Sequence, residues 1–248
     1  MKTRTPLFRI DRLFLAALAL LAVPHLHAQT TYTMTNQANA STWLTTNNWQ
    51  TNGVASTSRP DTNSIARFTN STTTSVGLNL NTSNTISSGS LLMGGTGTLT
   101  LSNSSGAAGG QLRLFGTGAD TNLIVNTNTG TLILTNGTSQ AMDLQLGTSG
   151  TINVSNSSGN VTIFSLIKQD SGETNGFNKT GAGTLTIAGT NSNTYSGLTT
   201  LSAGTLRFNK TAGQNVSAGD ILVSGGNLVL SSSNQMSDTM ALTNAGGT

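Results

Sequence analysis

Hydrophobic and polar residues alternate with a period of two in many short segments of this chain. The unit Gly-x-[Leu/Ile]-x-apolar occurs at 97–101, 110–114, 130–134, 150–154, 183–187, 204–208 and 226–230. A period of two is typical of a strand that buries one face and exposes the other. No segment after residue 30 shows a 3.6-residue apolar period of helical length. The pattern therefore predicts an all-β protein.

The spacing of these units predicts a repetitive architecture. Most successive units begin about 20 residues apart, an interval that indicates a solenoid. The longest gap, between Gly150 and Gly183, contains a further strand-like run at 161–164. The segments between the units are rich in Gly and Asn, which tolerate the positive φ angles of tight corners.

Two all-β architectures fit this pattern. In an antiparallel sandwich or barrel, strands recur about every 8–12 residues, whereas in a parallel β-helix each coil takes about 20 residues. The near-constant interval favours a β-helix of roughly ten coils, in which Leu99 stacks on Leu132 inside and Thr and Asn ladders line the outside. We expect residues 29–75 to form an N-terminal capping region and residues 76–248 to form the β-helix.

The first 28 residues have the features of a secretory signal peptide. A start with four Lys and Arg residues precedes an apolar run at 13–23, which is too short to cross a bilayer as a helix. Pro24 ends the run, and Ala28 offers a cleavage site before Gln29. We therefore expect export through the inner membrane and a mature chain that begins near residue 29.

Removal of this leader changes the charge and the available chemistry. The chain has 11 Lys and Arg and 8 Asp and Glu residues, of which four basic residues and Asp11 precede residue 29, so seven of each sign remain. A neutral chain has no basic patch for phosphates, so nucleic acid is not an expected partner. His25 and His27 leave with the leader, and the chain has no Cys, which excludes zinc–thiolate sites and the usual Ser-His and Cys-His triads. We expect no cofactor and no metal.

The segment 179–206 resembles a known family, the autotransporter-associated β-strand repeat, also called the passenger-associated transport repeat. The matching motif residues include Lys179, Gly181, Gly183, Leu185, Ile187, Gly189, Tyr195, Gly197, Gly204 and Leu206. The gap between Gly189 and Tyr195 is longer than in the family, and Leu198 stands where a second Gly is common; both departures concern the corner. The resemblance implies a right-handed β-helical passenger that is exported and often displayed at the surface of a Gram-negative-type cell, without a catalytic residue.

The same resemblance implies the partners of the chain. These are the export machinery and a C-terminal outer-membrane barrel, which we expect to be missing because the sequence stops at Thr248, where another Gly-Thr-Leu unit would begin. The expected location is secreted or cell surface, and the expected function is structural. An adhesin that binds surface glycans or other cells is the first alternative. A polysaccharide lyase or hydrolase is the second.

Few residues are candidates for ligand binding or catalysis. Trp43 and Trp49 form either a stacking platform for sugars or, as we favour, an aromatic plug at the N-terminal end of the β-helix. Asp170 and Glu173 are the closest pair of acids after the leader, but a glycosidase places two carboxylates across a sugar bond, and a spacing of three residues is more typical of a solvated loop. The remaining acids are Asp61, Asp120, Asp143, Asp220 and Asp238. Because we expect these on separate coils, we predict no catalytic residue.

Overall fold

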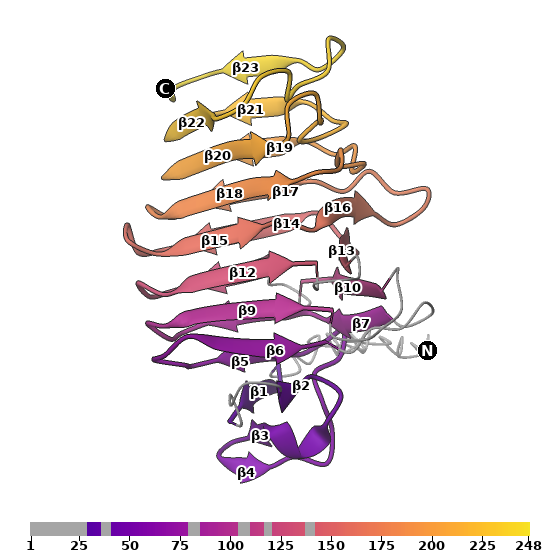
Figure 1. Ribbon diagram of the computed structural model, residues 1–248, viewed down its shortest axis with the longest axis vertical. Helices are drawn as coiled ribbons and strands as arrows, with labels where there is room; N and C mark the ends of the chain where they lie inside the picture. The colour runs from indigo at the N-terminus through magenta and orange to yellow at the C-terminus, as the bar shows by residue number, and fades with distance from the viewer. Residues whose placement is uncertain (1–28, 36–40, 79–84, 104–109, 117–120, 137–141) are drawn as a thin grey trace, which may run out of the picture.

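The computed structural model describes residues 29–35, 41–78, 85–103, 110–116, 121–136 and 142–248. Within these ranges the chain forms strands β1 to β23 and one short 3₁₀ helix, η1 (Thr46–Asn48). The strands wind into a parallel β-helix with its N-terminal end at the bottom of Figure 1. The prediction of an all-β parallel β-helix is therefore confirmed. The predicted leader, residues 1–28, lies outside the described residues.

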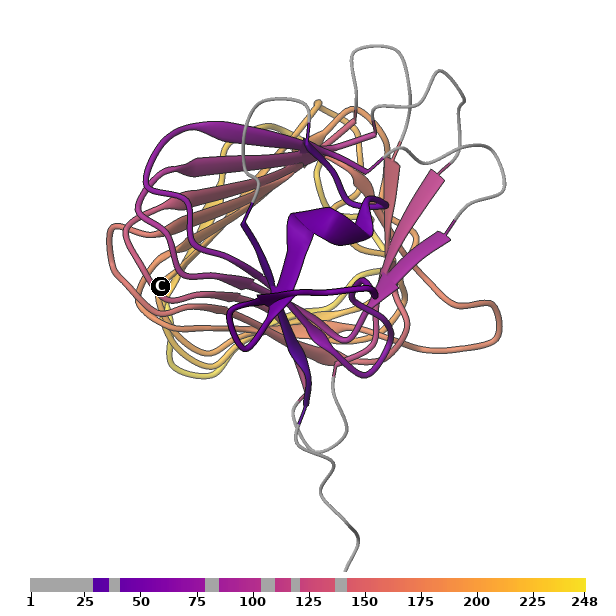
Figure 2. The same cartoon turned by 90° about the horizontal axis from the view of Figure 1, so that it is seen from below.

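Three sheets form the sides of the winding, and the chain passes from sheet A to sheet B to sheet C (Figure 2). The parallel strands of sheet A are β1 (Thr31–Met34), β5 (Ile65–Phe68), β8 (Ser90–Met93), β11 (Asn122–Asn126), β14 (Gly150–Val154), β17 (Phe177–Thr180), β19 (Thr199–Leu201), β21 (Ile221–Val223) and β23 (Leu242–Asn244). Sheet B contains β2 (Ser41–Thr42), β6 (Thr74–Gly77), β9 (Thr98–Ser102), β12 (Thr131–Thr135), β15 (Asn160–Ile163), β18 (Thr184–Gly189), β20 (Thr205–Lys210) and β22 (Asn227–Leu230). Sheet C contains β7 (Thr85–Ser88), β10 (Gly110–Leu114), β13 (Met142–Leu146) and β16 (Leu166–Gln169).

Each strand buries alternate side chains because the winding has a single interior. In β9, Leu99 and Leu101 are buried, whereas Thr98 is partly exposed. The register places Leu132 directly against Leu99, which confirms the predicted stacking. Repetition of this pairing in successive windings produces a continuous apolar core, and burial of its aliphatic side chains is the main favourable term in folding.

The length of a winding is not constant along the chain, and the last windings are the shortest. In sheet B, Leu99 pairs with Leu132 and Leu185 pairs with Leu206, so the later partners are much closer in sequence. The middle windings are longer because they include a strand of sheet C, which the later windings lack. Among the described residues, sheet B has eight strands and sheet C has four. The expectation of roughly ten coils was therefore wrong, because it assumed one short winding length for the whole chain.

The glycine spacing gave a wrong number of coils because successive glycines of the unit lie in different sheets. Gly110 begins β10 in sheet C, Gly130 precedes β12 in sheet B, and Gly150 begins β14 in sheet A. Their equal intervals do not measure a winding. The later units at 183–187 and 204–208 do occupy equivalent positions, since β18 pairs with β20.

After β16, a hydrogen-bonded column continues the third side. The backbone N–H of Thr194 donates to the carbonyl oxygen of Ile167 at 3.0 Å, and the N–H of Val216 donates to that of Gln235 at 2.9 Å. Tyr195 and Val216 are fully buried. The interior therefore remains closed on this side although no sheet is present.

A hairpin covers the N-terminal end of sheet A. Strands β3 (Trp49–Thr51) and β4 (Val54–Ala55) pair antiparallel, and β3 also pairs antiparallel with β1. The hairpin turns at Asn52 and Gly53, whose φ angles of 52° and 78° are both positive, as a type I′ turn requires. The described residues include no helix long and apolar enough to cross a membrane.

Candidate functional site

The motif glycines lie where successive windings approach too closely for a side chain. Gly181 and Gly204 have φ angles of 76° and 71° at the corner between sheets A and B. A Cβ on Gly183 would lie 2.4 Å from the carbonyl oxygen of Asn156 in the preceding winding. A Cβ on Gly189 would lie 2.4 Å from that of Phe164. These glycines permit backbone stacking, so their role is in the fold.

The remaining small and apolar motif residues also serve the stack. Leu185, Ile187 and Leu206 are buried inside sheet B. A Cβ on Gly197 would lie 2.3 Å from the carbonyl carbon of Asn175. None of these residues presents a chemical group to solvent.

Tyr195 is fully buried in the column that follows sheet C. Its hydroxyl shares a 2.8 Å hydrogen bond with Thr199 Oγ1, and its ring lies 5.6 Å from that of Phe177. Burial raises the pKa of the phenol to about 12. The hydroxyl is therefore neutral in ordinary solution and acts as a packing and hydrogen-bonding group.

Lys179 occupies an inward position that other windings fill with aliphatic residues. In sheet A it lies between Ile152 and Leu201, and it is fully buried. Its ammonium donates hydrogen bonds to the carbonyl oxygens of Thr180 and Gly181, both at 2.8 Å, and of Ala203 at 3.1 Å. Burial lowers the pKa of Lys179 to about 8.

Lys210 is a second buried lysine, and we did not predict it. It ends β20 and is 2% exposed. Its ammonium donates to the carbonyl oxygens of Ala188 at 3.0 Å and Asn191 at 2.8 Å. Burial lowers its pKa to about 8. One signal was available in the sequence, because Lys210 continues the alternation of Leu206 and Phe208.

Trp43 and Trp49 lie in the core at the N-terminal end. Both are fully buried, and their rings meet edge to face with centroids 4.9 Å apart. Trp49 Nε1 donates to the carbonyl oxygen of Trp43 at 2.9 Å. The rings of both residues also lie within 6.0 Å of Phe68. This geometry supports the plug interpretation, since neither indole offers an open face to a sugar.

The outer face of sheet C gathers charged side chains from neighbouring windings. Arg113 on β10 forms an ion pair with Asp170, to which Gln145 on β13 donates a hydrogen bond. Lys168 and Asp143 form a second ion pair at 2.7 Å. These contacts join side chains of different windings, since Asp143 lies on β13 and Asp170 follows β16, whereas Asp120 lies outside the described residues.

Asp170 is therefore not the free loop carboxylate that the local sequence suggested. Its side chain is 16% exposed, whereas Glu173 is exposed at the other end of a turn closed by its N–H and the carbonyl oxygen of Asp170. Among the described residues there is no group of three or more His, Cys, Asp and Glu that could hold a metal ion. The face combines cations, carboxylates and amides without a metal-binding cluster in the part of the chain that the structure describes.

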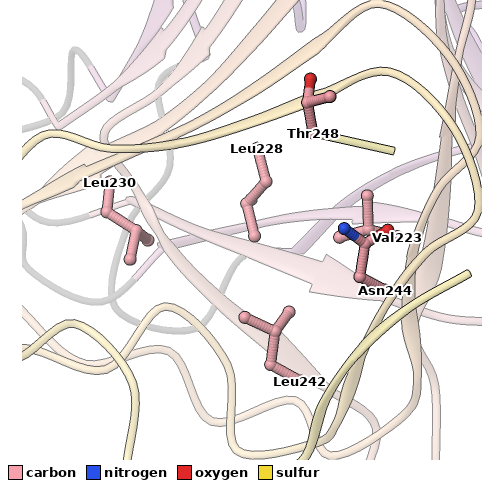
Figure 3. A pocket seen from close by; sticks show the side chains of 6 residues that line it. All are labelled: Val223, Leu228, Leu230, Leu242, Asn244 and Thr248. Atoms are coloured by element: carbon pink, nitrogen blue, oxygen red, sulfur yellow. The ribbon is translucent and has the colours of Figure 1, made fainter. Parts of the chain in front are cut away.

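An apolar hollow of about 220 Å³ lies at the C-terminal end (Figure 3). The lining residues are Val223, Leu228, Leu230, Leu242, Asn244 and Thr248. The leucines belong to β22 and β23, the last strands of sheets B and A. Because the lining offers almost no polar contact for a ligand, we assign no binding role to the hollow.

Comparison with known proteins agrees with this geometry. Residues 177–208 match the family model of the passenger-associated-transport-repeat. The match covers the segment 179–206 and confirms that resemblance. It begins at β17 and ends within β20, so it contains the corner of Lys179 and the buried Tyr195. Neither the curated proteins nor the solved structures gave a match to this chain.

Proposed function

We propose that this chain is an exported structural module, a β-helical stalk or passenger of an autotransporter-like surface protein, without catalysis. The observation that carries the proposal is the position of the matched repeat, 177–208, inside an uninterrupted stack of parallel strands. Every motif residue in this repeat packs the core, forms a corner or bonds to the backbone. A module whose motif residues all serve the fold is suited to a structural role.

The outer surface supports the same proposal. In sheet B, Thr98 pairs with Thr131 and Thr184 pairs with Thr205, and these positions point away from the core. Threonine hydroxyls interact with water and with each other but need an adjacent base to act as nucleophiles. The seven acids that follow the leader leave most of this surface without general acids or bases.

On this proposal, residues 1–28 direct the chain through the inner membrane, and outer-membrane translocation machinery then takes it to the cell surface. The family match supports this route. To test it, the complete chain and a variant that starts at Gln29 are produced in a Gram-negative-type cell. We expect the complete chain to lose its leader and leave the cytoplasm, and the variant to remain there. Retention of the complete chain in the cytoplasm would contradict the proposal.

A second candidate function is glycan binding by the outer face of sheet C. The specific observation is the group of Arg113, Gln145 and Asp170, which offers donors and acceptors side by side. A glycan array separates the candidates, since a scaffold gives no signal. Binding that disappears in Arg113→Ala but persists in Arg207→Ala, a change of an exposed cation on sheet B, would favour the adhesin. Cleavage of the bound glycan that is lost in Asp170→Asn would instead favour a lyase or hydrolase.

A further inference from the structure

Two of the three lysines that follow the leader, Lys179 and Lys210, are buried, and no carboxylate among the described residues pairs with them. Lys168 pairs with Asp143 on the surface, whereas Lys179 and Lys210 bond to backbone carbonyl oxygens. An uncompensated buried charge is expensive because the interior solvates ions poorly. Carbonyl oxygens stabilise the ammonium in part, but they carry no net charge to offset it.

The two lysines connect neighbouring windings at the two ends of sheet B: Lys179 lies just before its strand β18, and Lys210 ends its strand β20. Lys179 bonds forward to Ala203, which lies 24 residues later. Lys210 bonds back to Ala188, which lies 22 residues earlier. The two ammonium groups reach these acceptors only when the strands are stacked. Formation of both contacts is therefore a direct consequence of winding closure.

The ionisable groups on the packed elements do not offset these charges. Arg207, Asp220 and Asp238 are exposed. Tyr195 is buried but bonded to Thr199, and burial raises its pKa to about 12, so it is neutral. Within the part of the chain that the structure describes, desolvation therefore dominates the protonation of both lysines.

We propose that closure of the winding 177–210 is linked to protons, because folding carries Lys179 and Lys210 into carbonyl-lined corners without counter-ions and thereby favours release of their protons in mildly alkaline solution. This property depends on burial alone and not on export or surface display. It makes the repeat winding a pH-sensitive element of the stack.

The direction in which pH changes the free energy of unfolding follows from the protonation of each lysine in the folded and unfolded chain. The pKa of each lysine is about 8 in the folded chain, against an ordinary value of 10.5. Between these values the unfolded chain holds protons that the folded chain has released, so the free energy of unfolding rises with pH. This stabilisation is complete above pH 10.5 and is lost as pH falls through about 8. Near pH 9, unfolding should take up close to two protons per molecule, about one for each lysine.

The experiment follows the lysine side chains of the complete chain by NMR after ¹³C labelling, with assignments from Lys→Met variants. We expect the Cε signals of Lys179 and Lys210 to titrate near pH 8 in the folded chain and near pH 10.5 in denaturant. Titration at the same pH in both states would overturn the proposal. The titration itself is measured on the unmodified sequence, and the variants serve only to assign the signals.

Proton uptake on unfolding at about pH 9 gives an independent result. We expect close to two protons for the unmodified chain and about one less for Lys179→Met or for Lys210→Met. Methionine preserves the volume and the apolar stem of lysine, so it suits an inward position beside Ile152 and Leu201. An uptake that is unchanged in both buried variants would also overturn the proposal.

Discussion

Gly204 lies directly on Gly181 at the corner between sheets A and B. A Cβ added to Gly204 would lie 2.3 Å from the carbonyl oxygen of Gly181, and both residues have positive φ angles. Backbone therefore rests on backbone at this corner, and the distance between windings is set by main-chain atoms. The nearby ammonium of Lys179 can bond to Gly181 and Ala203 because no side chain separates the two windings.

This contact predicts a large effect of Gly204→Ala. The substitution places a side chain at a φ angle of 71° and against the backbone carbonyl oxygen of Gly181 in the preceding winding. We expect the free energy of unfolding to fall by about 3 kcal/mol or more. Urea-induced unfolding followed by circular dichroism measures this loss.

Gly213→Ala is the matched control for Gly204→Ala. Gly213 has a similar φ angle of 82°, but its added Cβ would meet nothing within 4 Å. The free energy of unfolding of Gly213→Ala should therefore fall only by the conformational cost of a side chain at a positive φ angle, about 1 kcal/mol. Equal losses in the two variants would show that close stacking is not the cause.

The aromatic plug predicts different costs for two similar substitutions. Trp49→Phe removes a buried N–H that donates to the carbonyl oxygen of Trp43. Trp43→Phe removes an N–H without a hydrogen-bond partner among the described residues. Since both indoles are fully buried, we expect Trp49→Phe to be the more destabilising by about 1 kcal/mol. Thermal unfolding of the two variants tests this order, and the reverse order would contradict it.

Strand positions and their inward faces could be predicted from the sequence, but most stacking partners could not. Leu99 and Leu132 have the same place in the Gly-x-Leu unit, so their pairing was predictable. The length of a winding depends on whether the chain adds a third strand and long corners between strands. Neither choice leaves a periodic apolar signal, which is why the coil count was wrong.

The same limitation applies to the polar residues. Asp143 and Asp170 are distant in the sequence, and only the winding length shows that both belong to the outer face of sheet C. Lys210 and the exposed Arg207 lie on opposite faces of β20. Lys210 continues the inward alternation that includes Phe208. Lysine is rarely buried, so the alternation alone did not identify it as an inward residue.

Tyr195 predicts a second pH effect, opposite in sign to that of the lysines. Burial raises its pKa to about 12 from an ordinary value of 10.0, so the folded chain keeps a proton that the unfolded chain loses. The stabilisation is complete below pH 10 and is lost as pH rises through about 12. Between these values, Tyr195→Phe should reduce the pH-dependent loss of unfolding free energy. Unfolding in urea at a series of pH values tests this, and identical slopes would contradict it.

The ion pair of Arg113 and Asp170 predicts a measurable coupling across windings. The two side chains come from β10 and from the segment after β16, and they are 32% and 16% exposed. Arg113 also lies over the ring of Phe115, with its guanidinium carbon 4.3 Å from the ring centroid, so its side chain is partly ordered before pairing. We expect a double-mutant cycle with Arg113→Ala and Asp170→Asn to give a coupling of about 1 kcal/mol.

Salt distinguishes this coupling from packing. An ion pair on a partly exposed face weakens as ionic strength rises, whereas apolar packing does not. The coupling should therefore fall between low salt and about 1 M salt, where the screening length is about 3 Å. A cycle with Lys168→Ala and Asp143→Asn, whose side chains also meet on sheet C, provides the matched pair. A coupling between Arg113 and Asp170 that is zero at low salt would mean that this ion pair does not hold the windings together, and its polar groups would then need a role outside the fold.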